Sequence, residues 1–188
     1  MDNRSRLLDH ALEAFALQGY EATGVQQIAA AAGITKPTLY HYFGSKAGLL
    51  TTLFSERLEP FLAKLAETAT YRKDMAGALQ EIVKTHFTFA EANPLLYRFL
   101  MALLYAPVES DAFKISQTYH ARQLQLMEIF FFEASKDHGN MMNRQKTYAA
   151  SFLGLVNTYV SLTLNQQIRV DETIIRNVVH QFMHGIFS

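Results

Sequence analysis

The sequence contains no cysteine among its 188 residues. This absence excludes disulfides, thiol nucleophiles, thiol-based redox sensing and zinc sites that use cysteine. The most apolar stretch, residues 99–108, is far shorter than the ~20 residues that a membrane-spanning helix needs. The first ten residues also lack the basic and apolar regions of a secretory signal, so we expect a soluble cytoplasmic protein.

An excess of charge of one sign is missing too. The 17 Lys and Arg residues balance 17 Asp and Glu residues, so the formal net charge at pH 7 is zero. Bulk charge therefore does not indicate nucleic acid or an anionic membrane as a partner. Glycine-rich phosphate loops, G-x-S-x-G and H-E-x-x-H are absent as well. We expect neither an enzyme nor a bound cofactor.

Proline occurs only four times, and alternating apolar and polar runs are absent. Apolar residues instead recur at spacings of three and four, which predicts an all-α protein of about nine helices. Pro60 is expected to end or kink the helix in which it lies, and Ser45 and Asp171 are expected to cap helices. The expected helices are one that ends at Gly19 and those at residues 25–31, 36–43, 46 onward, 73–92, 95–105, 111–135, 144–166 and 172–187.

The segment from Thr23 to Lys46 has the features of a helix-turn-helix. Thr23 and Gln26 form the T-x-x-Q pattern of a capping box at a helix start. Gly33-Ile34-Thr35 is a three-residue turn with glycine first, of the kind that joins two helices at a steep angle. Thr35 can cap the next helix, and Pro37 suits its first turn, where no amide donor is needed.

The second helix of this pair carries hydrogen-bond donors and planar rings, and no acidic residue lies between Glu21 and Glu56. A recognition helix places such side chains in the major groove of DNA, where acids would repel phosphate. The alternative is a helical ligand-binding or scaffold protein in which this motif is architecture only. The residues that we expect to contact DNA are Thr23, Gln26, Gln27, Thr35, Lys36, Pro37, Thr38, Tyr40, His41, Tyr42 and Lys46.

Residues 7–50 resemble the N-terminal domain of TetR-type (tetracycline-repressor-like) transcriptional regulators. The matching positions are Ala11, Phe15, Gly19-Tyr20, Thr23, Ile28-Ala29, Ala32-Gly33-Ile34, Leu39-Tyr40, Phe43, Lys46 and Leu49. The resemblance implies that Thr23, Thr35, Lys36, Thr38, Tyr40, His41 and Lys46 lie at DNA backbone and bases. Pro37 departs from the glycine of many members, and His41-Tyr42 varies the usual aromatic-histidine pair.

The resemblance further implies two domains, a DNA-binding domain at residues 1–50 and a helical ligand-binding and dimerisation domain at residues 51–188. We expect a homodimeric transcriptional repressor that a small, largely apolar effector releases from a pseudo-palindromic operator. Residues of the last two helices are suited to a four-helix dimer interface, with an ordinary intrachain core as the alternative. They are Ala150, Gly154, Thr158, Ile175, Val178, Val179, Phe182 and Met183.

The middle helices are rich in aromatic residues and methionine, as small-molecule pockets are, although such a stripe is also typical of a helical core. The expected pocket residues are His86, Phe89, Tyr97, Met101, Tyr105, Tyr119, Gln123, Met127 and Asn157. His180 and His184 are one helical turn apart, a spacing that could chelate a metal. Because no carboxylate accompanies them and imidazolium also suits a helix C-terminus, we expect no metal site.

Overall fold

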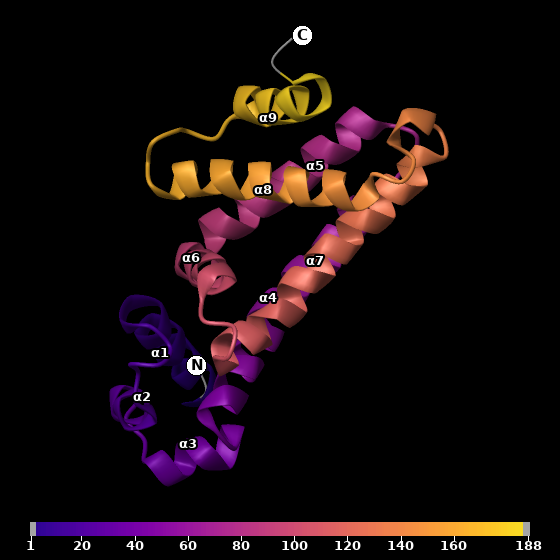
Figure 1. Ribbon diagram of the computed structural model, residues 1–188. Helices are drawn as coiled ribbons and strands as arrows, with labels where there is room; N and C mark the ends of the chain where they lie inside the picture. Colours follow the sequence, from indigo (N-terminus) through magenta and orange to yellow (C-terminus); the bar gives the residue numbers. More distant parts are fainter. Residues whose placement is uncertain (1–2, 186–188) are drawn as a thin grey trace. The chain divides into compact units, whose positions relative to one another are not determined.

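The computed structural model describes residues 3–185, and within them the chain consists of nine α-helices and two short 3-10 helices (Figure 1). This confirms the all-α prediction. The α-helices are α1 (Asn3–Gln18), α2 (Val25–Ala31), α3 (Lys36–Phe43), α4 (Lys46–Thr68), α5 (Met75–Ala92), α6 (Pro94–Ala102), α7 (Asp111–Ser135), α8 (Gln145–Leu164) and α9 (Glu172–His184). The 3-10 helices are η1 (Leu103–Tyr105) and η2 (Gly139–Met141).

Several helix ends follow local capping signals. Ser45 Oγ accepts from the Gly48 amide at 2.9 Å and Asp171 Oδ1 accepts from the Ile174 amide at 2.8 Å, as predicted. α5 begins two residues later than expected, because Asp74 Oδ1 accepts from the Gly77 amide at 2.9 Å. The expected end of the last helix, at residue 187, lies outside the described residues.

Pro60 does not end its helix, because α4 continues from Lys46 to Thr68. It does mark a division of the chain into two compact units. The first comprises Met1–Pro60 and Leu95–Tyr119, and the second comprises Phe61–Pro94 and His120–Ser188. The expected boundary at residue 50 is therefore not where the structure divides, and α4 contributes residues to both units.

The first unit takes in α6 and the start of α7 because aromatic side chains pack across it. Phe54 of α4 is fully buried, with its ring centroid 5.8 Å from that of Phe99 and 5.5 Å from that of Tyr119. The Phe15 ring of α1 also stacks on Phe99, with centroids 6.2 Å apart. A core confined to residues 1–50 would lack the contact between Phe15 and Phe99.

Two ion pairs join α1 to α4 within the first unit. Arg4 pairs with Glu56, and Arg57 Nη2 lies 2.6 Å from Asp9 Oδ1. All four side chains are at least a third exposed, so each pair contributes at most about 1 kcal/mol. They orient α1 against α4 more than they stabilise the unit.

The second unit has an aromatic core built by α4, α5, α7, α8 and α9. Phe61 stacks on Phe89 with ring centroids 4.3 Å apart. Phe182 of α9 lies with its ring centroid 4.9 Å from that of Phe152 and 5.7 Å from that of Phe131. α9 is thereby held on α5 and α8.

Candidate nucleic-acid interface and effector pocket

The turn between α2 and α3 has the tight geometry that the sequence predicts. Gly33 takes a φ of +71°, a conformation that other residues rarely adopt. Its amide bonds to the Ala30 carbonyl, and the Ile34 amide bonds to the Ala29 carbonyl, both at 3.0 Å. Ala29 and Ala32 are buried, so their small side chains allow α2 to approach its neighbours closely.

The start of α3 is fixed by its own residues. Thr35 is the N-cap, and its hydroxyl accepts from the Thr38 amide at 3.3 Å and lies 2.9 Å from the Thr38 hydroxyl. Pro37 lies in the first turn, as predicted. Leu39 and Phe43 face the interior and set which side of α3 is exposed.

The exposed side of α3 carries donors and rings. Lys36, Tyr40, His41 and Tyr42 are all exposed, and Thr38 is half-buried. The Lys36 ammonium lies 5.6 Å from the centre of the Tyr40 ring, within range of a cation–π interaction. Lys36 and Tyr40 thus form one surface that a phosphate or a base edge can approach.

The predicted capping box at α2 is wrong. Gly24 is the N-cap, and no side chain caps the helix. Thr23 is instead 2% exposed, and its hydroxyl lies within hydrogen-bond distance of the Ala14 carbonyl at 3.1 Å and the Gly19 carbonyl at 2.7 Å. The Thr23 side chain therefore faces the interior rather than DNA, because its hydroxyl bonds to one carbonyl in the last turns of α1 and to another just after the helix ends.

Gln26 and Gln27 of α2 are exposed, and Gln27 Nε2 donates to Gln18 Oε1 at 3.0 Å. The Lys46 amine bonds to the Glu21 carbonyl at 3.3 Å and lies 4.3 Å from the centre of the Tyr20 ring. Desolvation lowers the pKa of Lys46, opposed by Glu21 and Asp111, while burial raises the pKa of Tyr20 to about 12. Lys46 thus ties the start of α4 to the turn after α1. A phosphate contact for Lys46 stays a prediction.

The expected pocket residues do not form one described cavity. Tyr97, Met101, Tyr105 and Tyr119 belong to the first unit, and the other five belong to the second. Tyr105 is 91% exposed on η1, which contradicts a place in a pocket. The short helix turns this side chain outward, a detail that the apolar pattern alone does not reveal.

The second unit contains one buried group whose hydrogen bonding is incomplete. His86 is fully buried, and its Nδ1 donates to the Ile82 carbonyl at 2.9 Å, which leaves Nε2 as an acceptor. Among the described residues Nε2 has no hydrogen-bond partner. Burial lowers the pKa of His86, opposed by the Ile82 carbonyl and by the buried Gln123 side chain. The imidazole is therefore neutral at pH 7.

Replacing His86 with phenylalanine is expected to flatten the pH dependence of thermal stability. Because burial depresses the native pKa below 6.5, the unfolded chain binds a proton in the acidic range that the native protein does not. The wild type therefore loses stability as pH falls through 6.5, and H86F lacks this contribution. Melting curves across that range provide the measurement, with H180F, at an exposed position, as control. Parallel pH profiles for H86F and wild type would contradict the assignment.

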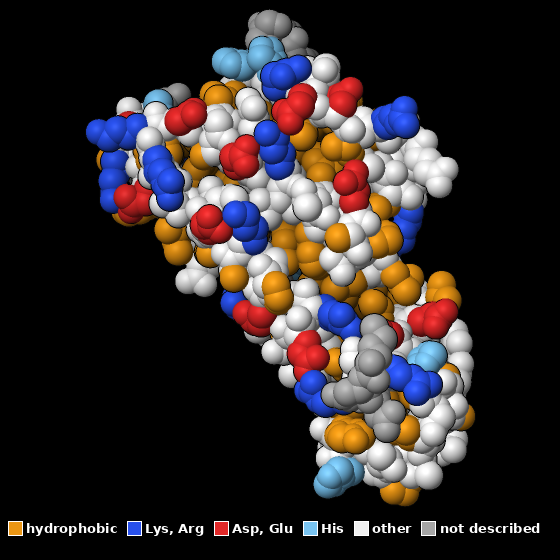
Figure 2. All heavy atoms as spheres, turned by 180° about the vertical axis from the view of Figure 1, so that it is seen from behind, with side chains coloured by type: hydrophobic (Ala, Val, Ile, Leu, Met, Phe, Trp, Pro, Cys, Tyr) orange, Lys and Arg blue, Asp and Glu red, His pale blue; other side chains and the backbone are white. Residues whose placement is uncertain are grey.

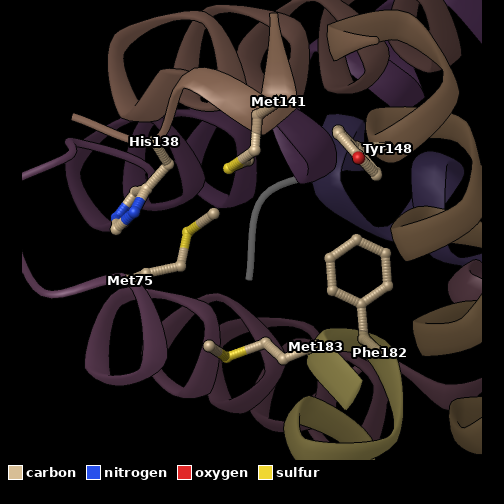
Figure 3. Close-up of a pocket in the computed structure, with 6 residues that line it drawn as sticks. All are labelled: Met75, His138, Met141, Tyr148, Phe182 and Met183. Carbon is tan, nitrogen blue, oxygen red and sulfur yellow. The ribbon is translucent and has the colours of Figure 1, made fainter. Parts of the chain in front are cut away.

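An open cavity of about 230 Å³ lies elsewhere in the second unit (Figure 3). Its lining combines three thioethers, two aromatic rings and an imidazole, from Met75, His138, Met141, Tyr148, Phe182 and Met183. Sequence reasoning assigned Phe182 and Met183 to a dimer interface and missed the other four. A signal for them lies in residues 136–143, between two of the expected helices, because this segment contains two methionines.

The structure divides the predicted dimer residues into two sets. Ala150, Gly154 and Thr158 lie exposed on one face of α8, and Met183 is 41% exposed. The prediction is wrong for Ile175, Val178 and Val179, which are 5% exposed or less and pack within the chain, and Phe182 joins the same intrachain core. The apolar face of α9 is used internally because α5 and α8 already cover it.

The His180 and His184 rings are 4.6 Å apart. Among residues 3–185 no group of three or more His, Asp or Glu residues is placed to hold a metal ion. No helix in that range is both long enough and apolar enough to cross a membrane.

A steep glycine turn followed by a helix with an exposed, acid-free face of donors and rings defines a helix-turn-helix DNA-binding protein. Comparison with known proteins makes the assignment specific. Residues 7–53 match the family described as "Bacterial regulatory proteins, tetR family". Residues 7–53 thus form the DNA-binding domain of a TetR-type transcriptional regulator, and the relatives that the chain matches are named as transcriptional regulators rather than enzymes.

Two relatives illustrate the range of the family. The transcriptional activator FasR of Mycolicibacterium smegmatis is 25% identical over 187 residues, covering 100% of this chain and 84% of FasR. The transcriptional repressor KstR2 of Rhodococcus jostii is 34% identical over 90 residues, which span 48% of this chain and 44% of KstR2.

Two solved structures share the fold. The fatty acid degradation regulator FadR from Bacillus halodurans superposes with a TM-score of 0.79 at 21% identity, covering 100% of this chain and 97% of that one. The regulator FadR from Bacillus subtilis, in complex with stearoyl-CoA, gives 0.77 at 20% identity, covering 97% of this chain and 98% of that one. At these identities the likeness establishes the fold alone.

Proposed function

We propose that the protein is a homodimeric transcriptional repressor that reads a pseudo-palindromic operator. The observation that carries this proposal is the exposed face of α3, with Lys36 beside Tyr40 and no acidic residue between Glu21 and Glu56. Each subunit places α3 in the major groove, and the two helices lie roughly 34–36 Å apart on the duplex or slightly more. Thr38 and Lys36 contact base edges, while Tyr40 and His41 contact phosphates.

The dimer is proposed to form through α8. Ala150, Gly154 and Thr158 present small side chains on one exposed face, and a Cβ added at Gly154 would meet nothing within 4 Å. Such a face permits close approach of a second copy of α8 in a four-helix arrangement. The apolar face of α9 is buried within the chain. In the proposed dimer the second subunit therefore contacts the outer side of α9, which includes Met183.

The effector is proposed to be a small, largely apolar molecule bound by the second unit. The apolar cavity there supports this, as does the stearoyl-CoA complex described for the similar Bacillus subtilis protein. The two DNA-binding units of a dimer can stand at a spacing that fits the operator or at one that does not. A ligand that binds the second arrangement better shifts the population of dimers toward it and so releases the operator. α4 supplies residues to both units and is the natural link.

The first test is the salt dependence of DNA binding. Lys36 and Lys46 are the two lysines of the first fifty residues, so a dimer has about four such contacts and an expected slope of about −4 for log affinity against log salt. Affinity for a duplex selected from a random pool, measured by fluorescence anisotropy at several salt concentrations, provides the slope. A slope near −10 would contradict this interface. Equal binding to selected and random duplexes would favour a scaffold role for the motif.

Replacing Pro60 with alanine is expected to alter the response to effector more than DNA affinity without effector. Proline removes a backbone donor from α4 at the point where the two units divide, and alanine restores the amide there. The measurement compares operator affinity of P60A and wild type with and without an effector that releases the wild type. If P60A loses operator affinity and effector response to the same extent, Pro60 has no role in coupling effector binding to operator release.

A further inference from the structure

Two histidines lie together in the last turns of α9. His180 and His184 are one helical turn apart and both are exposed, and their ring centroids are 4.6 Å apart. Figure 2 shows histidine side chains on the surface of the second unit at the top of the view, where Figure 1 places α9. Within residues 3–185 neither imidazole makes a hydrogen bond or an ion pair. Their ring nitrogens are therefore open to a ligand.

The sequence alone favoured a role for this pair in the helix itself, because no carboxylate accompanies it and imidazolium suits a helix C-terminus. The structure shows that the backbone ends α9 without the pair. Gly185 is the C-cap, and its amide bonds to the Gln181 carbonyl at 2.8 Å. Neither imidazole bonds to a carbonyl of the last turn. The negative pole of the helix dipole at this end favours any nearby cation, a metal ion included.

The distance between the two rings fits one shared metal ion. Such an ion lies about 2.0–2.1 Å from an imidazole nitrogen, and so about 3.2 Å from the centre of that ring. Two rings that meet at one ion at about 90–109°, the angles of square-planar and tetrahedral geometry, have centres about 4.5–5.2 Å apart. The distance of 4.6 Å between His180 and His184 lies within this range. The backbone of α9 therefore already holds the two rings at a chelating distance.

The charges of α9 do not oppose a cation at this position. Arg176 is the one Lys or Arg residue of the helix, and it lies one turn before His180. Its Nη2 lies 3.5 Å from Thr173 Oγ1, toward the N-terminal end of α9. A divalent ion on the pair would thus have no lysine or arginine of α9 in its own turn.

Two imidazoles select a class of metal ion. Imidazole nitrogen suits Cu²⁺, Ni²⁺ and Zn²⁺, whereas Mg²⁺ and Ca²⁺ prefer oxygen ligands. Residues 173–184 contain no Asp or Glu that would supply such oxygens. For a given nitrogen site the affinity is highest for Cu²⁺. Two nitrogens at a right angle also occupy half of the square plane that Cu²⁺ prefers.

We propose that His180 and His184 form a chelating site for a divalent transition-metal ion, with Cu²⁺ bound most tightly. One nitrogen of each imidazole is a ligand. Water, or the same pair of a second copy of the chain, supplies the rest of the coordination. The inference goes beyond operator reading and effector binding, and it depends on neither.

Isothermal titration calorimetry of the full-length chain with CuCl₂, NiCl₂, ZnCl₂ and MgCl₂ measures the site directly. We expect Cu²⁺ to bind most tightly, Ni²⁺ and Zn²⁺ to bind less tightly, and Mg²⁺ not to bind. One ion per chain assigns the remaining coordination to water, and one ion per two chains assigns it to the pair of a second copy. Binding of Mg²⁺ as tight as that of Cu²⁺ would overturn the proposal.

A variant that keeps both histidines but separates them provides the matched control. N177H/H180N moves one imidazole to another exposed position of α9, so the two histidines are then seven residues, or about 10 Å, apart along the helix and cannot share an ion. H180N and H184N each leave a single imidazole. All three variants are expected to bind Cu²⁺ at least ~10-fold more weakly than wild type, because the second ligand of a chelate binds intramolecularly.

H10N removes an imidazole of α1 that has no histidine one turn away, and it is expected to leave the affinity for Cu²⁺ unchanged. Melting curves without metal establish that each variant is folded, as expected for exposed positions of α9. The proposal would be overturned if wild type, H184N and N177H/H180N bound Cu²⁺ with the same affinity.

Discussion

Replacing Lys36 with alanine is expected to lower affinity for the selected operator by about 1–3 kcal/mol per half-site, or about 2–6 kcal/mol for a dimer. Lys36 is exposed on α3, and its ammonium lies over the Tyr40 ring, so the change removes a cation from the centre of the proposed DNA surface. Y40A removes the other half of this pair and is expected to have a similar effect. Fluorescence anisotropy with the selected duplex gives both affinities.

The control for this prediction is K64A, which removes an exposed lysine of the second unit. It is expected to leave operator affinity unchanged. The free energy of unfolding of K36A should lie within about 0.5 kcal/mol of the wild-type value. The Lys36 side chain is exposed and neither caps a helix nor packs in a core, so it contributes little to stability. An operator affinity of K36A equal to that of K64A would show that α3 does not enter the groove as proposed.

Replacing Phe54 with alanine is expected to destabilise the protein by about 3–5 kcal/mol. Phe54 is fully buried and meets Phe99 and Tyr119, so its removal leaves a cavity between α4, α6 and α7. For a chain of this size each kcal/mol lowers the melting temperature by about 2–4 °C, which gives a fall of about 6–20 °C. Operator binding should weaken as well, because Phe54 supports the unit that holds α3.

F132A is the matched control, since Phe132 is also on a helix but is 53% exposed. Its expected cost is below about 1 kcal/mol, largely the loss of the Lys136 contact with its ring. Chemical denaturation of both variants measures the difference. Equal costs for F54A and F132A would contradict the packing of α6 and α7 against α4 in the first unit.

Local signals in the sequence were sufficient where neighbours in the chain determine the structure. Gly33 takes the positive φ that a turn led by glycine requires, and Thr35, Ser45 and Asp171 cap the helices that follow them. In each case the donor, the acceptor or the backbone constraint lies within three residues. The same reasoning failed at Thr23, whose hydroxyl reaches the Ala14 carbonyl of α1 and the Gly19 carbonyl just after it, and caps no helix amide.

Pocket prediction failed for a different reason. The helical period shows that Phe89 and Met127 face an interior, but a cavity is the space that packed side chains leave between them. Met75 lies far from Met141 and Tyr148 in the sequence, and the last two belong to different elements, η2 and α8. Their meeting depends on how α5, η2 and α8 pack.

The sequence by itself determined that the protein is all-α and where the turn of its helix-turn-helix lies. These properties follow from spacing, capping and conformational preference over a few residues. The tertiary structure alone decided that α6 and the start of α7 complete the first unit, that Ile175, Val178 and Val179 are buried within the chain, and that a cavity opens beside Met141. The physical reason is that a helical apolar face requires a partner surface without specifying it, so only packing between distant segments settles which surface covers it.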